Sequence, residues 1–165
     1  MLQALHPRLV FALIVVAIAG FFGVALYTQY VDGLQPCPLC MTQRGFYILT
    51  GLFALLGALH GRARTVYGWL VTLAALGGAG VATRQVWLQH LPKDEVPACG
   101  PTLQYMLETL PMGEVLARMF QGDGNCALVD WTLLGLSMAE WSLLCFLGLA
   151  AAGLWQALRR VPAAA

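Results

Sequence analysis

Four cysteines in two polar segments are the residues of this chain most able to do chemistry. Cys37 and Cys40 form a Cys-Pro-Leu-Cys pair, and Cys99 and Cys126 lie in a later polar segment. Paired thiols that face an oxidising compartment can form disulfides and exchange them. Four thiols allow three complete pairings. Sequence proximity favours Cys37 with Cys40 and Cys99 with Cys126, and the pattern predicts disulfide chemistry beside a membrane.

The two-residue spacer between Cys37 and Cys40 is typical of redox motifs in which the pair lies where a helix begins. An apolar run follows Cys40, so the positive end of its helix dipole would face that sulfur. Arg44 comes four residues later, on the same helical face as Cys40. Both charges favour a thiolate at Cys40, a good leaving group. Alternatively, Arg44 is only an anchor at the membrane interface.

Two interpretations without catalysis also fit the cysteines. The four thiols could hold zinc, but Cys99 and Cys126 lack the short spacing of zinc ribbons, and we expect no metal. Two structural disulfides without turnover remain the stronger alternative. Cys145 lies inside the last apolar run without a nearby thiol, as expected of a small buried hydrophobic residue.

The composition indicates a membrane protein. Of 165 residues, 59% are hydrophobic and 10% are charged, whereas a soluble domain has about 25% charged residues. A net charge of +1 without a basic cluster gives no support for nucleic-acid binding. Four uncharged runs are each long enough to cross a bilayer as a helix. We therefore predict an all-α bundle of four transmembrane helices in one membrane domain, at residues 9–28, 43–61, 65–84 and 141–158.

Charge asymmetry predicts the orientation of these helices. The terminal segments 1–8 and 159–165 and the link 62–64 carry only basic residues, and all eight acidic residues lie elsewhere. The positive-inside rule then places both termini in the cytoplasm and segments 29–42 and 85–140 on the outer side of the membrane, which for a bacterial inner membrane is the periplasm. Ala17-Ile18-Ala19 resembles a signal-peptidase site, but the apolar run continues to Tyr27, which favours an uncleaved span.

The second periplasmic segment contains one amphipathic stretch. Between Pro111 and Gln121, apolar residues recur at helical spacing: Met112, Val115, Leu116, Met119 and Phe120. We predict a short horizontal helix, which lies either on the membrane surface or against its own loop.

Polar side chains gather near the periplasmic ends of the predicted spans. They are Gln29, Gln43, Arg44, Arg84, Gln85 and Gln89. Polar groups at membrane depth are costly and often functional. Their donors could bind the carbonyl oxygens of a quinone headgroup while its tail stays in lipid. Hydrogen bonds between helices are the alternative for each glutamine.

Taken together, these features closely resemble the DsbB family over essentially the whole chain. The matching features are Cys-x-Leu-Cys-x-x-x-Arg at 37–44, Gln29 upstream, Cys99 and Cys126 in the second loop, and the 131–141 run before the last span. The resemblance implies a quinone reductase that re-oxidises DsbA, a periplasmic protein with a thioredoxin fold. At Gln85 the chain departs from the best-known family member, which has a histidine there.

The resemblance also implies roles for individual residues. The DsbA thiolate would attack Cys99, the released Cys126 would exchange with Cys37, and Cys40 would donate electrons to a quinone. That quinone, ubiquinone or menaquinone, would bind without a covalent bond near Arg44, Gln29, Gln85 and Gln89. A vitamin-K-epoxide-reductase-like enzyme, or a membrane scaffold with two structural disulfides, are the alternative functions. Neither the oligomeric state nor the resting disulfides follow from the sequence.

Overall fold

Four long helices form the body of the protein. The computed structural model describes residues 7–61, 63–101 and 103–159. Its long helices are α1 (Pro7–Tyr30), α2 (Pro38–His60), α3 (Arg64–Gln89) and α6 (Met138–Leu158). All four are long and apolar enough to cross a membrane, which confirms the predicted all-α membrane protein with four helices.

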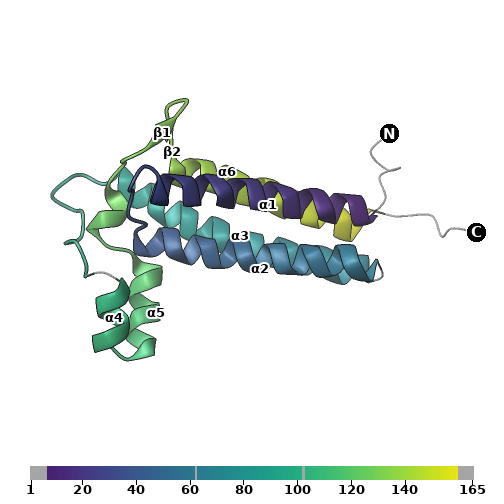
Figure 1. The fold of residues 1–165 in the computed structure, drawn as a ribbon, viewed down its shortest axis with the longest axis horizontal. Coiled ribbons are helices and arrows are strands. Elements are labelled where there is room, and N and C mark those ends of the chain that lie inside the picture. The colour runs from purple at the N-terminus through teal and green to yellow at the C-terminus, as the bar shows by residue number, and fades with distance from the viewer. Residues whose placement is uncertain (1–6, 62, 102, 160–165) are drawn as a thin grey trace, which may run out of the picture.

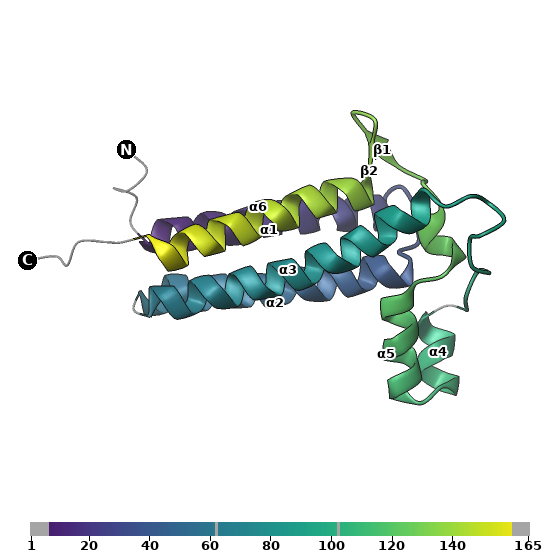
Figure 2. The same ribbon diagram turned by 180° about the vertical axis from the view of Figure 1, so that it is seen from behind.

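The four helices lie side by side, and the remaining elements gather at one end of the bundle, here called the loop end (Figure 1). The start of α1, the end of α6 and the link between α2 and α3 lie at the opposite end (Figures 1 and 2). Two of the basic residues that predict the orientation lie outside the described residues: Arg62 and Arg160. His6 in the first terminal segment also lies outside them.

Helix α2 begins before the second cysteine of the Cys-Pro-Leu-Cys pair. Cys37 is its N-cap, and the Cys37 thiol accepts the backbone N–H of Cys40 at 3.4 Å. Pro38 occupies the first turn, where its missing N–H costs no hydrogen bond. Cys40 therefore lies in the first turn of α2, although the uncharged run suggested a later start. Helix α3 continues to Gln89, so that Gln85 and Gln89 lie one turn apart.

Small residues allow α3 and α6 to approach closely. A Cβ atom on Gly68 would lie 2.7 Å from the backbone nitrogen of Ala157, and one on Gly153 would lie 2.8 Å from Thr72 Oγ1. Further along the same interface, the Phe146 ring occupies the space beside Gly78. Close backbone approach of this kind is how membrane helices gain packing energy without a hydrophobic driving force.

Two short helices, α4 (Leu103–Thr109) and α5 (Met112–Gln121), project sideways from the loop end (Figure 1). Helix α5 lies where the amphipathic helix is predicted, whereas the sequence pattern does not predict α4. Met106 of α4 and Val115 of α5 are buried, each 1% exposed. Met112, Leu116 and Phe120 remain exposed. The α4–α5 pair thus buries Met106 and Val115, while the half-exposed Phe120 ring meets Phe46 of α2 edge to face.

The chain returns to the bundle through a 3-10 turn, η2 (Gly124–Ala127), and a hairpin of β1 (Thr132–Leu133) and β2 (Leu136–Ser137). Leu134 and Gly135 make the hairpin turn with φ of 55° and 83°, as two-residue hairpin loops require. Ser137 then caps α6, because its hydroxyl accepts the N–H of Glu140 while the Glu140 carboxylate accepts the N–H of Ser137.

We predict that Gly68→Ala destabilises the bundle. The added methyl would overlap the α6 backbone at Ala157, and overpacking costs about 1–3 kcal/mol. The measurement is helix loss during denaturation with sodium dodecyl sulfate in mixed micelles, followed by circular dichroism. Gly80→Ala is the matched control, because nothing lies within 4 Å of a Cβ atom there. Equal stability of the two variants would contradict the packing described for α3 and α6.

Candidate functional site

Three of the cysteines predicted to be reactive converge at the loop end. The sulfur atoms of Cys37 and Cys40 are 3.1 Å apart. Cys37 also shares a hydrogen bond with Cys126, which lies in η2. Cys37 and Cys126 are buried, with 7% and 0% of their surface exposed. Because Cys37 contacts both other thiols, we call Cys126, Cys37 and Cys40 the sulfur row.

An apolar cluster holds the sulfur row together. Leu39 of α2 and Leu88 of α3 are 0% exposed and pack with Cys37 and Cys126. Gly122 ends α5 with φ of 73°, and a Cβ atom there would lie 2.6 Å from Leu39 Cδ1. Glycine adopts this positive φ without strain, and it has no Cβ atom that would overlap Leu39. The chain can therefore turn tightly over Leu39 and bring η2 against the start of α2.

Cys99 is exposed, next to the turn that leads to Cys126. The N–H of Gly124 donates to the carbonyl of Ala98 at 3.2 Å, and the N–H of Gly100 donates to Asp123 Oδ2 at 3.1 Å. A Cβ atom on Gly124 would lie 3.2 Å from the sulfur of Cys99. The structure thus places Cys99 beside η2, where a protein from solution can reach it.

Hydrogen bonding makes the thiols of the sulfur row unequal. The Cys37 thiol donates to Cys126, and this hydrogen bond is the main reason why the pKa of Cys126 lies below its usual range. The same hydrogen bond, followed by the one with Cys40, raises the pKa of Cys37. In the reduced protein, Cys126 therefore carries a negative charge more readily than Cys37, and a thiolate is the attacking form in disulfide exchange.

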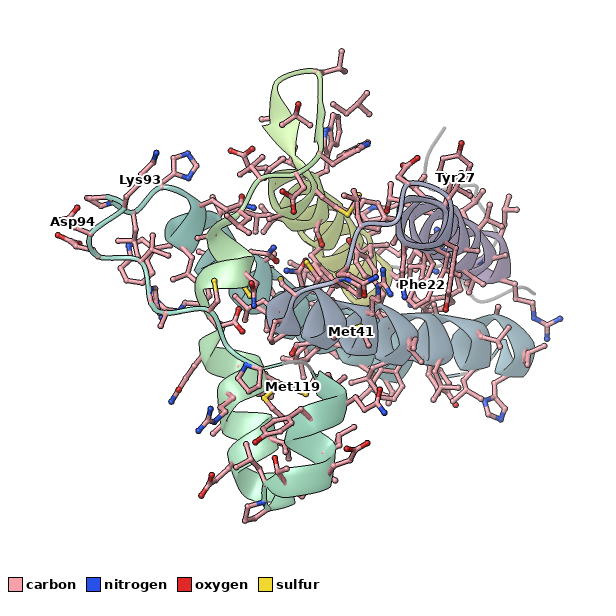
Figure 3. The ribbon with its side chains drawn as sticks, turned by 60° about the vertical axis from the view of Figure 1, so that its left-hand side comes forward. Phe22, Tyr27, Met41, Lys93, Asp94 and Met119 are labelled. Carbon is pink, nitrogen blue, oxygen red and sulfur yellow. The ribbon has the colours of Figure 1, made fainter. Side chains whose placement is uncertain are left out.

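A pocket opens beside Cys37 and Cys40. Four polar side chains also line this pocket: Gln43, Arg44, Gln85 and Gln89. Three aromatic residues line it as well: Phe21, Phe22 and Tyr47. Cys99, Cys126 and Gln29 are not among its lining residues. Figure 3 looks toward this end of the molecule, with Phe22 on α1 close to the start of α2 at Met41 (Figure 3).

Arg44 connects α1 with α2 at the edge of the pocket. Its guanidinium donates to the side-chain oxygen of Gln29 and, at 3.1 Å, to the carbonyl oxygen of Ala25. Gln29 therefore contacts Arg44 and holds it in place from outside the pocket. Arg44 and Cys40 both remain among the residues that line the pocket.

The two glutamines of α3 have different partners. Gln85 Nε2 donates to the sulfur of Cys40 at 3.2 Å and lies 3.5 Å from that of Cys37. Gln89 accepts the hydroxyl of Ser137 at 2.8 Å through its Oε1. Gln85 thus faces the sulfur row, and Gln89 lies at the junction with the β-hairpin.

Tyr47 and Asp123 belong to this site but have no assigned role in the sequence analysis. Tyr47 follows Cys40 at helical spacing, so the periodicity of α2 alone could have placed it on the same face. Tyr47 stacks on Phe146 with ring centroids 4.0 Å apart and lies beside Cys145 of α6. Asp123 caps η2 by accepting the N–H of Asn125 at 3.0 Å. The Gly-Asp-Gly-Asn run at 122–125 is a turn signal, which could have placed Asp123 in the bend before Cys126.

The fold and the sulfur row define a class of protein: a membrane helical bundle with a thiol–disulfide exchange centre. Residues 7–156 match the family described as "Disulfide bond formation protein DsbB". The chain belongs to this family.

Named relatives cover most of the chain. A "Disulfide bond formation protein B" of Hahella chejuensis is 51% identical over 159 residues, which are 94% of this chain and 96% of the relative. A protein of the same name from Saccharophagus degradans is 52% identical over 86% of this chain and 87% of the relative. "Disulfide bond formation protein B 1" of Pseudomonas aeruginosa is 48% identical over 93% and 96%. The chain is thus a disulfide-forming membrane oxidoreductase.

We predict that Cys37 and Cys126 cross-link readily. In a Cys40→Ser, Cys99→Ser variant, mild oxidation should join them, because their thiols are already in hydrogen-bond contact. The matched control, Cys37→Ser with Cys99→Ser, leaves Cys40 and Cys126 and should cross-link more slowly. Blocking of free thiols with a maleimide of high mass, followed by gel electrophoresis, measures both yields. Equal rates in the two variants would contradict the order of the sulfur row.

The pKa of Cys126 should rise when Cys37 is removed. The test compares a reduced variant that retains only Cys37 and Cys126 with a second one that also carries Cys37→Ala. Loss of the donated hydrogen bond destabilises the Cys126 thiolate, so its ultraviolet thiolate absorbance should develop at higher pH. A titration that stays in place or moves to lower pH would show that Cys37 does not stabilise this thiolate.

Proposed function

We propose that the protein re-oxidises a DsbA-like periplasmic thiol oxidase and passes the electrons to a membrane quinone. The observation that carries this proposal is the sulfur row, which extends from the exposed loop that bears Cys99 to the wall of the pocket between the helices. A centre that only stabilised the fold would need neither an exposed thiol nor a pocket at the other end.

Electron flow in the proposed reaction follows this row. A thiolate of the reduced partner attacks Cys99 in the Cys99–Cys126 disulfide and releases Cys126 as a thiolate. Cys126 attacks Cys37 in the Cys37–Cys40 disulfide, and Cys40 leaves with the electron pair. The second partner thiol resolves the mixed disulfide and releases Cys99, which attacks Cys126 in the Cys37–Cys126 disulfide and frees Cys37. Cys37 and Cys40 would then re-form their disulfide as two electrons pass to the quinone. Overall, a dithiol and a quinone give a disulfide and a quinol, with two electrons and two protons transferred.

The pocket residues fit a quinone ring. Arg44 and Gln89 supply donors, and the Gln89 oxygen is already bound to Ser137, so its Nε2 is left without a protein partner among the described residues. Phe21, Phe22 and Tyr47 supply flat apolar surface, and aromatic faces favour stacking with a planar ring. In this proposal the quinone, ubiquinone or menaquinone, supplies a two-electron acceptor that is soluble in lipid.

The proposed orientation agrees with the arrangement of the helices. The loop end carries all four reactive cysteines, and the opposite end carries Arg8 and Arg64. We place the loop end in the periplasm and both termini in the cytoplasm of a bacterial inner membrane, where quinone and thiol oxidase are both available.

The partner is expected to approach through Cys99. A thioredoxin-fold protein attacks disulfides that protrude into solution, and Cys99 is exposed on a segment tied to η2 by backbone hydrogen bonds. The mixed disulfide can then form without disturbing the buried cysteines. Release of Cys126 leaves that thiolate beside Cys37, its next reaction partner.

The direct test mixes the purified protein with reduced DsbA and ubiquinone in lipid and follows quinone absorbance. We expect quinone loss equal to the disulfide formed in DsbA. Cys99→Ser should abolish both the turnover and the mixed disulfide, because no electrophilic sulfur remains for the partner. Cys145→Ser serves as the control and should turn over normally. A mixed disulfide at full yield in Cys99→Ser would show that another cysteine is attacked, and no quinone loss in the unmodified protein would refute the proposed function.

A further inference from the structure

We propose that Gln85 is a catalytic residue which stabilises the thiolate released at Cys40, and that Gln43 is the positioning residue which orients it. The inference rests on the proposed direction of electron flow, and it assigns Gln85 to the sulfur atoms instead of the quinone. The resemblance placed Gln85 only among the quinone contacts and gave Gln43 no role.

The Gln85 amide lies directly against the reacting atoms. Gln85 is 4% exposed, and its Nε2 contacts the sulfurs of both Cys40 and Cys37, at 3.2 and 3.5 Å. A carboxamide nitrogen carries two hydrogens, so it can donate toward both sulfurs. An anion released in a buried site is strongly disfavoured unless a donor compensates the lost water. Two side chains at the pocket donate to Cys40 Sγ, Cys37 and Gln85. Cys37 has no thiol hydrogen once it is joined to Cys126, so Gln85 then supplies this donor.

Gln43 determines which end of the Gln85 amide meets the sulfurs. Gln43 is also 4% exposed, and its Nε2 donates to Gln85 Oε1 at 2.7 Å. A flipped Gln85 amide would turn its NH₂ group toward that of Gln43 and its oxygen toward Cys40. The oxygen would then repel a thiolate. Cys40 Sγ lies 3.2 Å from Gln85 Nε2 and 3.6 Å from Gln85 Oε1. The contact between α2 and α3 therefore keeps the donating end of the Gln85 amide nearer to the sulfur than its oxygen.

Arg44 does not occupy this place. Its guanidinium donates to Gln29 and to the carbonyl of Ala25, both on α1. A positive charge near Cys40 acts over a distance, whereas the amide of Gln85 acts through direct contact. The two groups thus approach Cys40 from different helices, α2 and α3.

The exchange step shows what the amide contributes. A bond forms between Cys126 and Cys37, the Cys37–Cys40 bond breaks, and its electron pair goes to the sulfur of Cys40. No net oxidation occurs, and one negative charge moves from Cys126 to Cys40. The neutral amide of Gln85 donates a hydrogen bond without giving up a proton. The electron pair therefore stays on the Cys40 sulfur, from which the quinone would accept it. Because the amide favours the reduced form, it also makes the Cys37–Cys40 couple more oxidising.

The test measures this couple without partner or quinone, so that its outcome is independent of the proposed function. In a Cys99→Ser, Cys126→Ser background, the full-length protein is equilibrated with glutathione buffers and quenched with acid. The fraction of Cys37–Cys40 disulfide is then read by mass. We expect Gln85→Met to shift the equilibrium about tenfold toward the disulfide, which corresponds to a reduction potential about 30 mV lower.

Gln43→Met should shift the equilibrium in the same direction. If Gln43 acts through Gln85, the double variant will match Gln85→Met alone, whereas independent effects would add. Gln85→Asn keeps a polar amide but moves its N–H donor away from the Cys40 sulfur, because the side chain is one methylene shorter. It serves as a second variant if Gln85→Met folds poorly. It should also lower the potential. Gln156→Met is the matched control, because it removes a buried amide at the opposite end of the bundle, where Gln156 bonds to Pro7.

An unchanged equilibrium in folded Gln85→Met or Gln85→Asn would overturn the role of Gln85. Additive shifts in the double variant would overturn the positioning role of Gln43. A shift in Gln156→Met as large as that in Gln85→Met would also overturn the proposal, because any lost buried amide would then have the same effect. If the shifts occur as expected but no quinone is ever consumed, the role of the amide stands and the proposed function fails.

Discussion

The contact between η2 and the first turn of α2 is the interaction on which the rest of the site depends. It is apolar: Leu39 and Leu88 are fully buried and enclose Cys126 against Cys37. Without it, the second loop would carry two cysteines at the end of a long connection. In the proposed exchange, this contact would let Cys126 attack Cys37 without first bringing two distant segments together, which removes most of the entropic cost of the step.

Around this contact, Cys99 and the cysteines of the sulfur row each have a distinct environment. Cys99 is exposed and lies beside the turn before Cys126. Cys126 is buried and packs against Cys37, the sulfur that it attacks in the proposed exchange. Cys40 borders the pocket and receives the Gln85 amide. Negative charge can thus move from a site open to a protein partner to a site open to the membrane, and each sulfur in between stays shielded from water.

The sequence predicted the elements whose signal is local. Four uncharged runs correspond to the four long helices, and the apolar spacing after Pro111 corresponds to α5. Helix α4 was missed, because seven residues in a segment broken by prolines give too short a period to recognise. The spacing of small residues is a weak signal of helix packing. Gly23 and Gly148 each lie four residues from an alanine, as in closely packed membrane helices, yet nothing lies within 4 Å of a Cβ atom at either position. Helical spacing shows which residues share one face of a helix, but it does not show which element packs against that face.

The site itself was predictable as a set of residues, but its internal order was not. The spacing of Cys37, Cys40 and Arg44 could be read directly, whereas the contact of Cys126 with Cys37 joins residues far apart in the chain. The three possible pairings therefore stayed open until the loops were placed. Likewise, the glutamines were recognisable as polar groups in an apolar region, but only the packing of α3 against α2 shows that Gln85 faces sulfur and Gln43.

The most direct measurement follows the disulfides during a single turnover. Oxidised protein with bound quinone is mixed with reduced DsbA, quenched with acid at successive times, and its disulfides are identified by mass spectrometry beside the quinol formed. We expect a Cys37–Cys126 disulfide to appear after the mixed disulfide at Cys99 and to precede quinol. Quinol formation at full rate while Cys37 and Cys126 never join would show that electrons do not travel along the sulfur row.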